Sequence, residues 1–500
     1  MSFLQHLYFG FSIALLPINL LYGFIGAVLG TFIGVLPGLG PVATISILLP
    51  ITFTLGPQQA MIMLAGIYYG AQYGGSTTAI LVNLPGESSS VVTAIEGYQM
   101  ARQGKAGLAL ATAALASFFA GTTATFVIAL ATPSLAEVAL DFGPADYCSL
   151  MLFGLIGAVI LAHGSVTKAI GMILIGMLLG MIGIDVNTSV PRFTFGIPQF
   201  DDGIDFAVIA MGIFGIGETI CNLERKEADR SRLDTKLRLW PTWAELRSIF
   251  APTLRGTILG SALGILPGGG PVLSSFSAYA LEKKVSSHPE RFGTGAIEGV
   301  ASPEAANNAA AQTSFIPLLT LGLPSNPVMA LMIGTLMMQG LNPGPQLMRD
   351  KPDLFWGVIA SMWVGNLMLV ILNLPLVGIW ARLLTVPYRY LYPAILLVCA
   401  VGVYSINNSS LDVVIASGFG LIGYVLYRLR CEPAPLLLGV ILGPLIEENM
   451  RRALLISHGS LAVFVERPIS ATFLVLAAIL IVILAAPSIR VARERAFEES

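Results

Sequence analysis

The sequence predicts an all-α polytopic membrane protein that consists of two inverted structural repeats. Three observations lead to this prediction: a composition poor in charge, a series of long apolar stretches, and a glycine–proline motif that occurs twice. Of the 500 residues, 55% are hydrophobic and 11% are charged, whereas soluble domains contain about 25% charged residues. Because so few charges cannot cover the surface of a soluble chain of this length, lipid must cover much of it.

The apolar stretches are of two lengths. The longer ones approach the ~20 residues that a helix needs to cross ~30 Å of hydrocarbon. They are residues 7–36, 108–132, 147–161, 170–184, 206–220, 354–380, 392–403, 413–427 and 469–486. Shorter pieces, such as 42–55 and 272–281, adjoin Pro or Gly and are interpreted as half-helices or re-entrant hairpins, which must be buried in protein or line a wet cavity. We expect roughly a dozen transmembrane helices with re-entrant hairpins and broken helices.

The duplicated motif is the strongest sign of two repeats. Gly34-Val-Leu-Pro-Gly-Leu-Gly-Pro41 recurs as Gly264-Ile-Leu-Pro-Gly-Gly-Gly-Pro271, at an offset of 267 − 37 = 230. The glycines before it, Gly26 and Gly30, keep the same offset. Further along, Asn83-Leu-Pro-Gly86 matches Gly322-Leu-Pro-Ser325 at an offset of 239, and Gly176 matches Gly439 at 263. Order is preserved while the offset grows, as insertions in the second copy would produce.

Charge divides the chain and orients the repeats. The expected organisation is a first transmembrane repeat (1–221), a cytoplasmic linker (222–250), a second repeat (251–487) and a cytoplasmic tail (488–500). The linker holds seven Lys or Arg residues, which the positive-inside rule places in the cytoplasm. The loop that follows the first motif is uncharged, whereas its equivalent after the second motif contains Lys283, Lys284 and Arg291. Equivalent loops of the two repeats thus differ in positive charge, which predicts that they lie on opposite faces of the membrane and that the repeats are inverted.

One pair of matched loops contradicts this pattern. The loop that contains Arg102 and Lys105 and the loop that contains Arg349 and Lys351 are both basic. Inversion does not explain them.

The two helix breaks are candidate binding sites. Proline removes a backbone donor and disfavours continued helix, and the helix that restarts afterwards directs N–H groups and a partial positive charge at its ligand. An anion fits such a site, and paired broken helices bind substrate in transporters. A structural hinge, with the glycine ladder serving helix packing, is the alternative. The residues predicted to supply backbone contacts to substrate are Gly38, Leu39, Gly40, Gly268, Gly269 and Gly270.

Two polar elements follow the breaks and offer side-chain ligands. Their hydroxyl and amide groups can bind carboxylate oxygens or Na⁺, or can simply cap helices. The candidates are Ser76, Thr77, Asn83, Asn307, Asn308, Thr313, Ser325 and Asn326. Glu298 and Glu304 flank the second element and are the coupling-ion candidates, since intramembrane carboxylates are usually functional. Neither element contains Lys or Arg, so a bound carboxylate is expected to rest on amides, hydroxyls and helix ends.

Other functions find no support in the sequence. HExxH, GxSxG and P-loop motifs do not occur, so we expect neither an enzyme nor an ATPase, and no cofactor. An Na⁺ or H⁺ gradient is then the expected energy source. The four cysteines are scattered without metal-ligand spacing, and no basic–aromatic array predicts nucleic-acid binding.

Three runs of residues together resemble a known family. They are the doubled break motif, Gly74-Gly-Ser-Thr-Thr-Ala-Ile-Leu-Val-Asn-Leu-Pro-Gly-Glu87, and Ser302-Pro-Glu-Ala-Ala-Asn-Asn308. They resemble the large membrane subunit of the bacterial tripartite tricarboxylate transporters. The resemblance implies a secondary transporter of the bacterial inner membrane that works with a small membrane subunit and a periplasmic solute-binding protein. It further implies carboxylate uptake driven by a cation gradient.

The expected function is therefore import of citrate-like tricarboxylates or other organic acids by the large permease subunit of such a transporter. By analogy with other inverted-repeat carboxylate transporters, we expect an elevator-like movement. The alternatives are a passive organic-anion channel and a non-transporting membrane scaffold. Uptake that is unaffected by collapse of both the Na⁺ and the H⁺ gradient would favour the channel over the coupled transporter.

Overall fold

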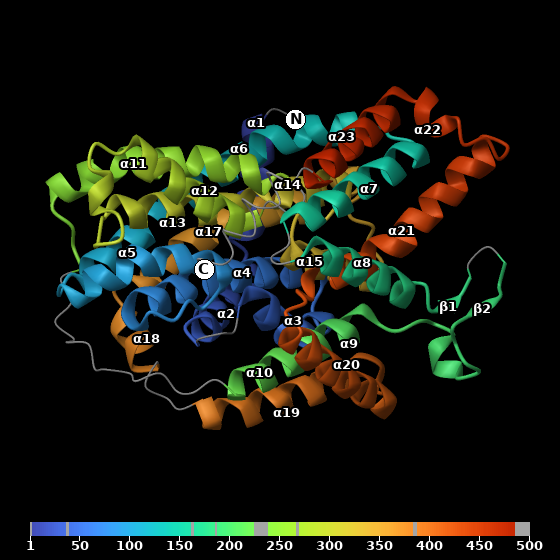
Figure 1. Cartoon of the computed structure of the whole chain (residues 1–500), viewed down its shortest axis with the longest axis horizontal. Helices are drawn as coiled ribbons and strands as arrows, with labels where there is room; N and C mark the ends of the chain where they lie inside the picture. The colour runs from blue at the N-terminus through green and yellow to red at the C-terminus, as the bar shows by residue number, and fades with distance from the viewer. Residues whose placement is uncertain are drawn as a thin grey trace.

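The computed structural model describes residues 3–36, 40–161, 165–185, 188–224, 239–266, 270–383 and 388–485, and this part of the chain is almost entirely helical (Figure 1). The one exception is a short antiparallel ribbon of β1 (Gly183–Ile184) and β2 (Pro191–Arg192), in which Gly183 pairs with Arg192. The all-α prediction is thus confirmed.

The helices of the first half precede residue 225. They are α1 (Phe3–Ala14), α2 (Pro17–Gly34), α3 (Pro41–Phe53), α4 (Pro57–Val82), η1 (Ser88–Ser90), α5 (Val91–Arg102), α6 (Ala106–Ala139), α7 (Pro144–Leu161), α8 (Val166–Gly180), η2 (Pro198–Phe200), α9 (Phe206–Ala210), the π-helical η3 (Met211–Gly217) and α10 (Glu218–Glu224).

The second half begins inside the segment predicted as the linker, because α11 starts at Trp243 with a Thr242–Glu245 capping box. Its helices are α11 (Trp243–Gly264), α12 (Gly270–Val285), η4 (Pro289–Arg291), α13 (Glu298–Thr313), α14 (Phe315–Leu321), α15 (Pro327–Met338), α16 (Pro345–Asp350), α17 (Pro352–Asn373), α18 (Val377–Leu383), α19 (Tyr388–Asn407), α20 (Ser410–Arg428), α21 (Ala434–Ile456), α22 (Val463–Glu466) and α23 (Pro468–Ala485). The predicted tail, 488–500, lies outside the described residues.

Within the described residues, five helical stretches are long and apolar enough to cross a membrane. They are α2, α6, the continuous stretch Phe206–Glu224, α17 and α20. Six shorter apolar helices, of 10–17 residues each, accompany them. The chain is therefore a multi-pass membrane protein by the length and composition of its helices.

Two glycine ladders hold parallel helices at close approach. In the first, α2 lies on α4, and a Cβ added at Gly30 would come within 2.8 Å of the Ile67 Cα. In the second, α11 lies on α13, and a Cβ at Gly260 would come within 2.6 Å of the Ala306 Cα. Both distances are too short for any side chain, so glycine is required where the backbones touch.

The contacts of the two ladders match along their whole length. The carbonyl groups that face the glycines of the first ladder belong to Met63, Ile67 and Ala71, and those of the second to Ser302, Ala306 and Ala310. Taken in order, each carbonyl of the first ladder is separated from its equivalent in the second by 239 residues, as in 302 − 63 = 239. This is also the offset of the later Leu-Pro matches. Equivalent sequence therefore makes equivalent packing in both halves.

Helices from the two halves also contact each other directly. At one end of their contact, the Tyr69 and Phe315 ring centroids are 6.1 Å apart, and at the other Ser76 donates a hydrogen bond to Glu304. Residue numbers rise along α4 as they fall along α13 and α14. Helix α4 and the segment formed by α13 and α14 therefore run in opposite directions where they meet.

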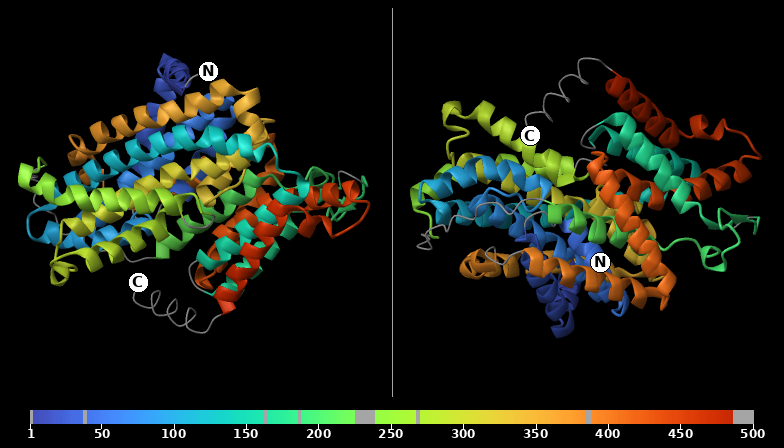
Figure 2. Two further views of the ribbon diagram at one scale, coloured as in Figure 1. Left: turned by 90° about the horizontal axis from the view of Figure 1, so that it is seen from above. Right: turned by 60° about the horizontal axis from the view of Figure 1, so that its bottom comes forward.

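A second contact between the halves, which is reciprocal, joins α8 and α21. Gly176 lies against the Leu436 carbonyl, while Gly439 lies against the Ile173 carbonyl. The offset of 263 relates Gly176 to Gly439 and Ile173 to Leu436, so it converts each contact into the other. Figure 2 (left) shows that these helices, with α7 and α23, form a group set obliquely to the long helices α6, α11 and α17.

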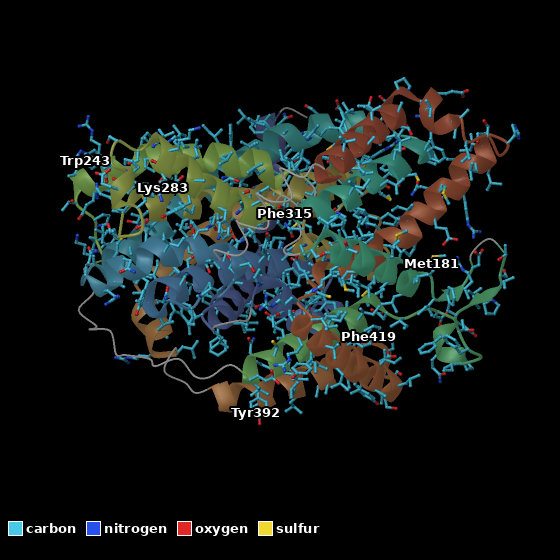
Figure 3. All side chains as sticks on the ribbon, in the orientation of Figure 1. Met181, Trp243, Lys283, Phe315, Tyr392 and Phe419 are labelled. Carbon is cyan, nitrogen blue, oxygen red and sulfur yellow. The ribbon has the colours of Figure 1, made fainter. Side chains whose placement is uncertain are left out.

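The middle of the molecule is buried and partly polar. Every residue of α13 from Gly299 to Thr313 is buried, including Glu304 and Asn307. Figure 3 shows Phe315 near the centre of the molecule, and this ring is fully buried, whereas Trp243 at one end is 82% exposed. Such a polar centre must satisfy its own hydrogen bonds, because lipid offers none.

Candidate functional site

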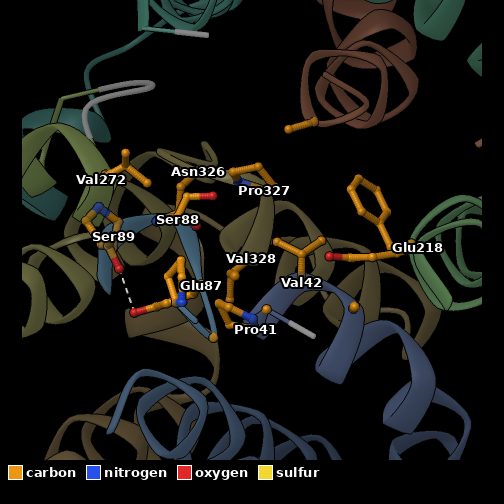
Figure 4. Close-up of a pocket in the computed structure, with 18 of the residues that line it drawn as sticks. Pro41, Val42, Glu87, Ser88, Ser89, Glu218, Val272, Asn326, Pro327 and Val328 are labelled. Atoms are coloured by element: carbon orange, nitrogen blue, oxygen red, sulfur yellow. Dashed lines mark hydrogen bonds between the residues drawn. The ribbon is translucent and has the colours of Figure 1, made fainter. Parts of the chain in front are cut away.

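A cavity of ≈ 470 Å³ lies between the two halves of the chain. One wall consists of residues 40–43 at the start of α3, 85–89 before α5, 270–273 at the start of α12 and 326–328 at the start of α15, with Tyr68 and Gln72 of α4. The opposite wall consists of η3, α10, the end of α20 and the start of α21. Figure 4 shows Pro41, Val272 and Asn326 on the first wall and Glu218 on the second.

On the first wall, the N-termini of α3, α12 and α15 open onto this cavity. α3 begins at Pro41 after an extended Gly40, and α15 begins at Pro327 after Asn326. α12 begins at Gly270, the equivalent of Gly40 in the second copy of the motif. Proline suits the first helical position, where no intrahelical donor is needed. The free N–H groups of the first turns and the helix dipoles make this wall attractive to anions.

The lining contains no Lys, Arg or His among the described residues. Its charged groups are instead the carboxyls of Glu87, Glu218 and Glu432. A negatively charged ligand would therefore rest on backbone amides and neutral side chains, as the sequence predicts.

Glu87 is held at the edge of the cavity by its neighbours. Ser89 Oγ donates to Glu87 Oε1 at 2.5 Å, and Asn307 Nδ2 donates to the same oxygen at 3.1 Å. The carboxyl group also takes part in a capping box with Ser90 at the start of η1. Glu87 is 9% exposed. Figure 4 shows the Ser89–Glu87 hydrogen bond beside Pro41.

Asn326 occupies the corresponding place in the second half. Its Oδ1 accepts a hydrogen bond from the Met329 N–H and thus caps α15. Its Nδ2 donates to Ser314 Oγ at 3.0 Å and to Tyr68 Oη at 3.4 Å. The amide is therefore oriented by contacts from both halves of the chain.

Two buried amides beside the cavity have unused hydrogen-bonding capacity. Neither amide atom of Gln72 makes a well-formed hydrogen bond within the described residues, although the side chain is fully buried and lines the cavity. Asn307 Oδ1 likewise lacks a partner there. Buried polar atoms are usually paired in native structures. The unpaired atoms therefore indicate a ligand or bound water.

A second polar cluster lies outside the cavity lining and centres on Glu304. Ser76 Oγ donates to the Glu304 carboxyl at 2.8 and 2.9 Å, and the Thr93 and Ser117 hydroxyls contact it too. Asn308 Nδ2 donates to Ser117 Oγ at 2.6 Å. Three helices of the first half thus supply hydroxyls to one carboxyl group of the second.

The structure distributes the predicted site residues over three places. Gly40, Gly270 and Asn326 line the cavity, and Asn307 reaches it through Glu87. Ser76 and Asn308 belong to the cluster around Glu304. Gly38, Leu39, Gly268 and Gly269 lie outside the described residues.

The remaining candidates have local roles. The hydroxyls of Thr77 and Thr313 bond to carbonyls one turn back in their own helices, and Ser325 Oγ donates to the Ser314 carbonyl. Asn83 ends α4 in the left-handed conformation, with φ 56°, and is exposed. Glu298 begins α13, 3.8 Å from Arg291, outside the cavity lining.

Other lining residues were not among the predicted site. Tyr68 and Gln72 precede the polar run of α4, and Glu218, Tyr427 and Glu432 form the far wall. The offset of 239 that relates Pro85 to Pro324 also relates Glu87 to Asn326. That pairing was the available signal for Glu87, whereas no repeat links the far-wall residues to the motifs.

The described residues contain no group of three or more His, Cys, Asp or Glu that could hold a metal ion. Cys148, Cys221, Cys399 and Cys431 are free thiols. A cation held by one carboxylate and several hydroxyls is a different kind of site, and the Glu304 cluster has that donor set.

Apolar helices that surround a cavity lined by broken-helix termini define a multi-pass membrane protein with a cavity between its two halves. Residues 20–438 match the tripartite tricarboxylate transporter TctA family, and the chain belongs to this family of transporters.

The relatives found are close in sequence but carry no functional description. One, from Agrobacterium vitis, is printed as "uncharacterized 52.8 kDa protein in TAR-I ttuC' 3'region"; it is 57% identical over 499 residues, covering 100% of this chain and 99% of the relative. Another from the same organism, "uncharacterized protein in TAR-II ttuC' 3'region", is 58% identical over 240 residues, covering 48% of this chain and 99% of the relative. No solved structure matches the chain.

Proposed function

We propose that this chain is the large permease subunit of a binding-protein-dependent secondary transporter, which imports carboxylates with an Na⁺ or H⁺ gradient. One observation carries the proposal: the starts of α3, α12 and α15 face one cavity that no described cationic side chain lines. Such a wall attracts anions without fixing them by full ion pairs, so a bound carboxylate can also leave. A transporter needs both properties.

Membership of a tripartite family supports two partners in the bacterial inner membrane and periplasm. They are a small membrane subunit and a solute-binding protein that delivers the carboxylate. Part of the substrate choice then lies in the binding protein rather than in this chain.

Inverted repeats are part of the proposal. The matched ladders support a duplication, and the opposite directions of α4 and α13 at their contact support inversion of those two helices. A two-fold relation that exchanges the halves brings α3 and α12 to the same cavity from opposite sides. One anion can then meet both helix starts, as in other transporters with broken helices.

The position of the cavity supports an elevator-like movement. Its first wall belongs to the ladder helices and their hairpins, and its second wall to η3, α10 and the segment from α20 to α21. Sliding of the first group along the second would expose the cavity alternately to either side of the membrane. The oblique group of α7, α8, α21 and α23 would extend the stationary part (Figure 2).

Uptake in the native host tests the proposal. Disruption of the gene should abolish uptake of at least one radiolabelled carboxylate from a panel that includes citrate, and the wild-type gene should restore it. A gene with Asn307→Ala and Asn326→Ala together should restore an uptake rate at least about tenfold lower than the wild-type gene does. The reason is that one hydrogen bond to a charged group contributes about 1.5–3 kcal/mol to substrate binding. Asn407→Ala is the matched control, since Asn407 is exposed and bonds to Asp412.

The same cells separate a transporter from a channel. Collapse of both the Na⁺ and the H⁺ gradient should stop accumulation. Uptake that continues unchanged would favour the passive organic-anion channel, and uptake that survives gene disruption for every carboxylate would favour a non-transporting scaffold.

A further inference from the structure

Glu87 and Asn326 occupy equivalent positions of the two repeats. Each follows a Leu-Pro-x sequence, Leu84-Pro85-Gly86 and Leu323-Pro324-Ser325, at the offset of 239. Each is the N-cap of the helix that follows, η1 or α15, and each lines the cavity. The repeats thus place a carboxyl and a carboxamide of nearly the same shape at matching points.

Their contacts are reciprocal as well. Asn307 of α13 donates to Glu87, and Asn326 donates to Tyr68 of α4. Because 307 − 68 = 239, the partners are related by the same offset as Glu87 and Asn326 themselves. The pair therefore belongs to one two-fold arrangement, and its members differ by one methylene and by the terminal group, a carboxyl in Glu87 and a carboxamide in Asn326.

That difference decides what the site can bind. The Asn326 amide is neutral in any state, and its N–H groups donate to Ser314 and Tyr68. The Glu87 carboxyl is neutral, and able to donate a hydrogen bond, only when it is protonated. An ionised Glu87 would instead repel a carboxylate in the same cavity. With a proton on Glu87, both equivalent positions become neutral donors, and the cavity becomes suited to an anion.

Among the described residues, the surroundings of Glu87 provide no cation that could replace the proton. Neither side-chain donor to its Oε1, Ser89 or Asn307, is charged. The other titratable groups that face it or the cavity, from the elements packed around it, are Tyr68, Glu218, Cys221, Tyr427 and Glu432 in the lining and Glu304 on α13. All of these are acids, and burial of an ionised carboxyl without a counter-charge costs several kcal/mol.

The unpaired amide atoms of Gln72 and of Asn307 point independently to a ligand at this place. Gln72 lies on the same wall as Glu87 with both amide atoms unused among the described residues, and Asn307 holds Glu87 directly. A carboxylate beside a protonated Glu87 would supply acceptors for the Gln72 N–H groups.

We propose that Glu87 is the proton-coupling ligand of the cavity: its carboxylate takes one proton from water on the outer side, and the resulting O–H donates a hydrogen bond to the substrate carboxylate. On the cytoplasmic side the substrate leaves, and the proton passes to water, which restores the carboxylate. Each cycle moves one proton inward through Glu87. The inference rests on the proposed carboxylate transport and identifies H⁺ as a coupling ion of that same site.

Ligand binding to the purified full-length chain tests this inference. Thermal stabilisation by mono-, di- and tricarboxylates, citrate among them, is titrated between pH 5.5 and 8.5 to obtain an apparent Kd at each pH. In the wild type, Kd should rise about tenfold per pH unit on the alkaline side of the range, because one proton is bound with the ligand. Glu87→Gln, a permanent neutral donor, should bind tightly throughout and show only the titration of the ligand itself.

Two further variants keep the test decisive. Asn326→Asp retains an acceptor for the Met329 N–H and adds a second titratable carboxyl, so its Kd should rise about a hundredfold per pH unit under the same linkage. Glu466→Gln removes an exposed carboxyl of α22 outside the cavity lining and should retain the wild-type pH dependence. Should Glu87→Gln fail to fold, Asn326→Asp still tests the inference. Its apparent Kd should rise about a hundredfold per pH unit if both Glu87 and the carboxyl introduced at position 326 must be protonated, and only about tenfold if Glu87 is not involved.

The outcomes separate the inference from the function on which it rests. Carboxylate binding that does not depend on pH in the wild type, or whose pH dependence survives in Glu87→Gln, overturns the role of Glu87 and leaves carboxylate transport standing. A wild-type chain that binds no carboxylate of the panel at any pH overturns both.

Discussion

The two glycine ladders allow a prediction with a definite sign. Gly30→Ala and Gly260→Ala add a methyl group where two helix backbones touch, at equivalent places in the two halves. The new Cβ would lie 2.8 Å from the Ile67 Cα in the first case and 2.6 Å from the Ala306 Cα in the second. Ordinary contact begins at 3.4 Å. The helices must therefore part by more than 3.4 − 2.8 = 0.6 Å or 3.4 − 2.6 = 0.8 Å, because the carbonyl oxygens of the same two residues would lie closer still.

The energy follows from two opposing effects. Overpacking of a well-packed interior costs about 1–3 kcal/mol, and the upper end applies here because the obstructing atoms are backbone and cannot rotate away. Alanine in place of glycine in a helix contributes about 1 kcal/mol in favour of folding. The expected net effect is a destabilisation of about 2 kcal/mol for each variant, from the difference of these two figures.

Gly365→Ala in α17 is the matched control. Gly365 is also buried in a helix, but a Cβ there would meet nothing within 4 Å. Only the helix-propensity gain applies, so this variant should be as stable as the wild type or more so. The change in stability should therefore be zero or favourable in Gly365→Ala and unfavourable in the two ladder variants.

Thermal unfolding of the detergent-solubilised protein measures the order of stability. Gly365→Ala should unfold at or above the wild-type midpoint, and both ladder variants below it. Carboxylate uptake should fall in the ladder variants as well, because the ladders set the positions of α3 and α12. A ladder variant that is as stable as Gly365→Ala would refute the close backbone contact and the reasoning built on it.

Two further predictions concern buried carboxyl groups. Arg467→Met leaves Asp146, whose side chain is fully buried, without the cation that contacts it at 2.5 Å; the protein should lose about 3–5 kcal/mol of stability, and adding Asp146→Asn should recover part of the loss in thermal midpoint. Ser76→Ala removes hydrogen bonds of 2.8 and 2.9 Å to Glu304 and should cost about 1–3 kcal/mol. Thr77→Val is its neighbour control and should cost less, since the Thr77 hydroxyl bonds only to a carbonyl of its own helix; equal losses in both variants would contradict the role of Ser76.

Local signals in the sequence predicted the elements that surround the cavity. Pro41 and Pro271 mark helix starts because a proline needs no intrahelical donor there, and the structure begins α3 at Pro41 and α12 next to Pro271. The glycine spacing of four predicted close helix packing, which both ladders confirm. These signals are short in sequence and depend on backbone chemistry, so they can be read without the fold.

The roles of the acidic residues could not be read in this way. Glu298 and Glu304 lie six residues apart on one helix, yet the first is partly exposed beside Arg291 and the second is buried among hydroxyls. The groups that distinguish them come from residues 187 to 228 positions away. A sequence pattern cannot rank such residues, because burial and partners depend on which distant helix packs against them.

The sequence by itself determined the membrane class, the duplication, the positions of the helix breaks and the family. Composition, proline and glycine act locally, and their consequences hold in any packing of the chain. Only the tertiary structure decided that the breaks of both halves face one cavity, that residues of α10, α20 and α21 close it, and that Asn307 contacts Glu87 while Tyr68 contacts Asn326. Those facts arise from contacts between segments more than 200 residues apart, which the folded chain alone brings together.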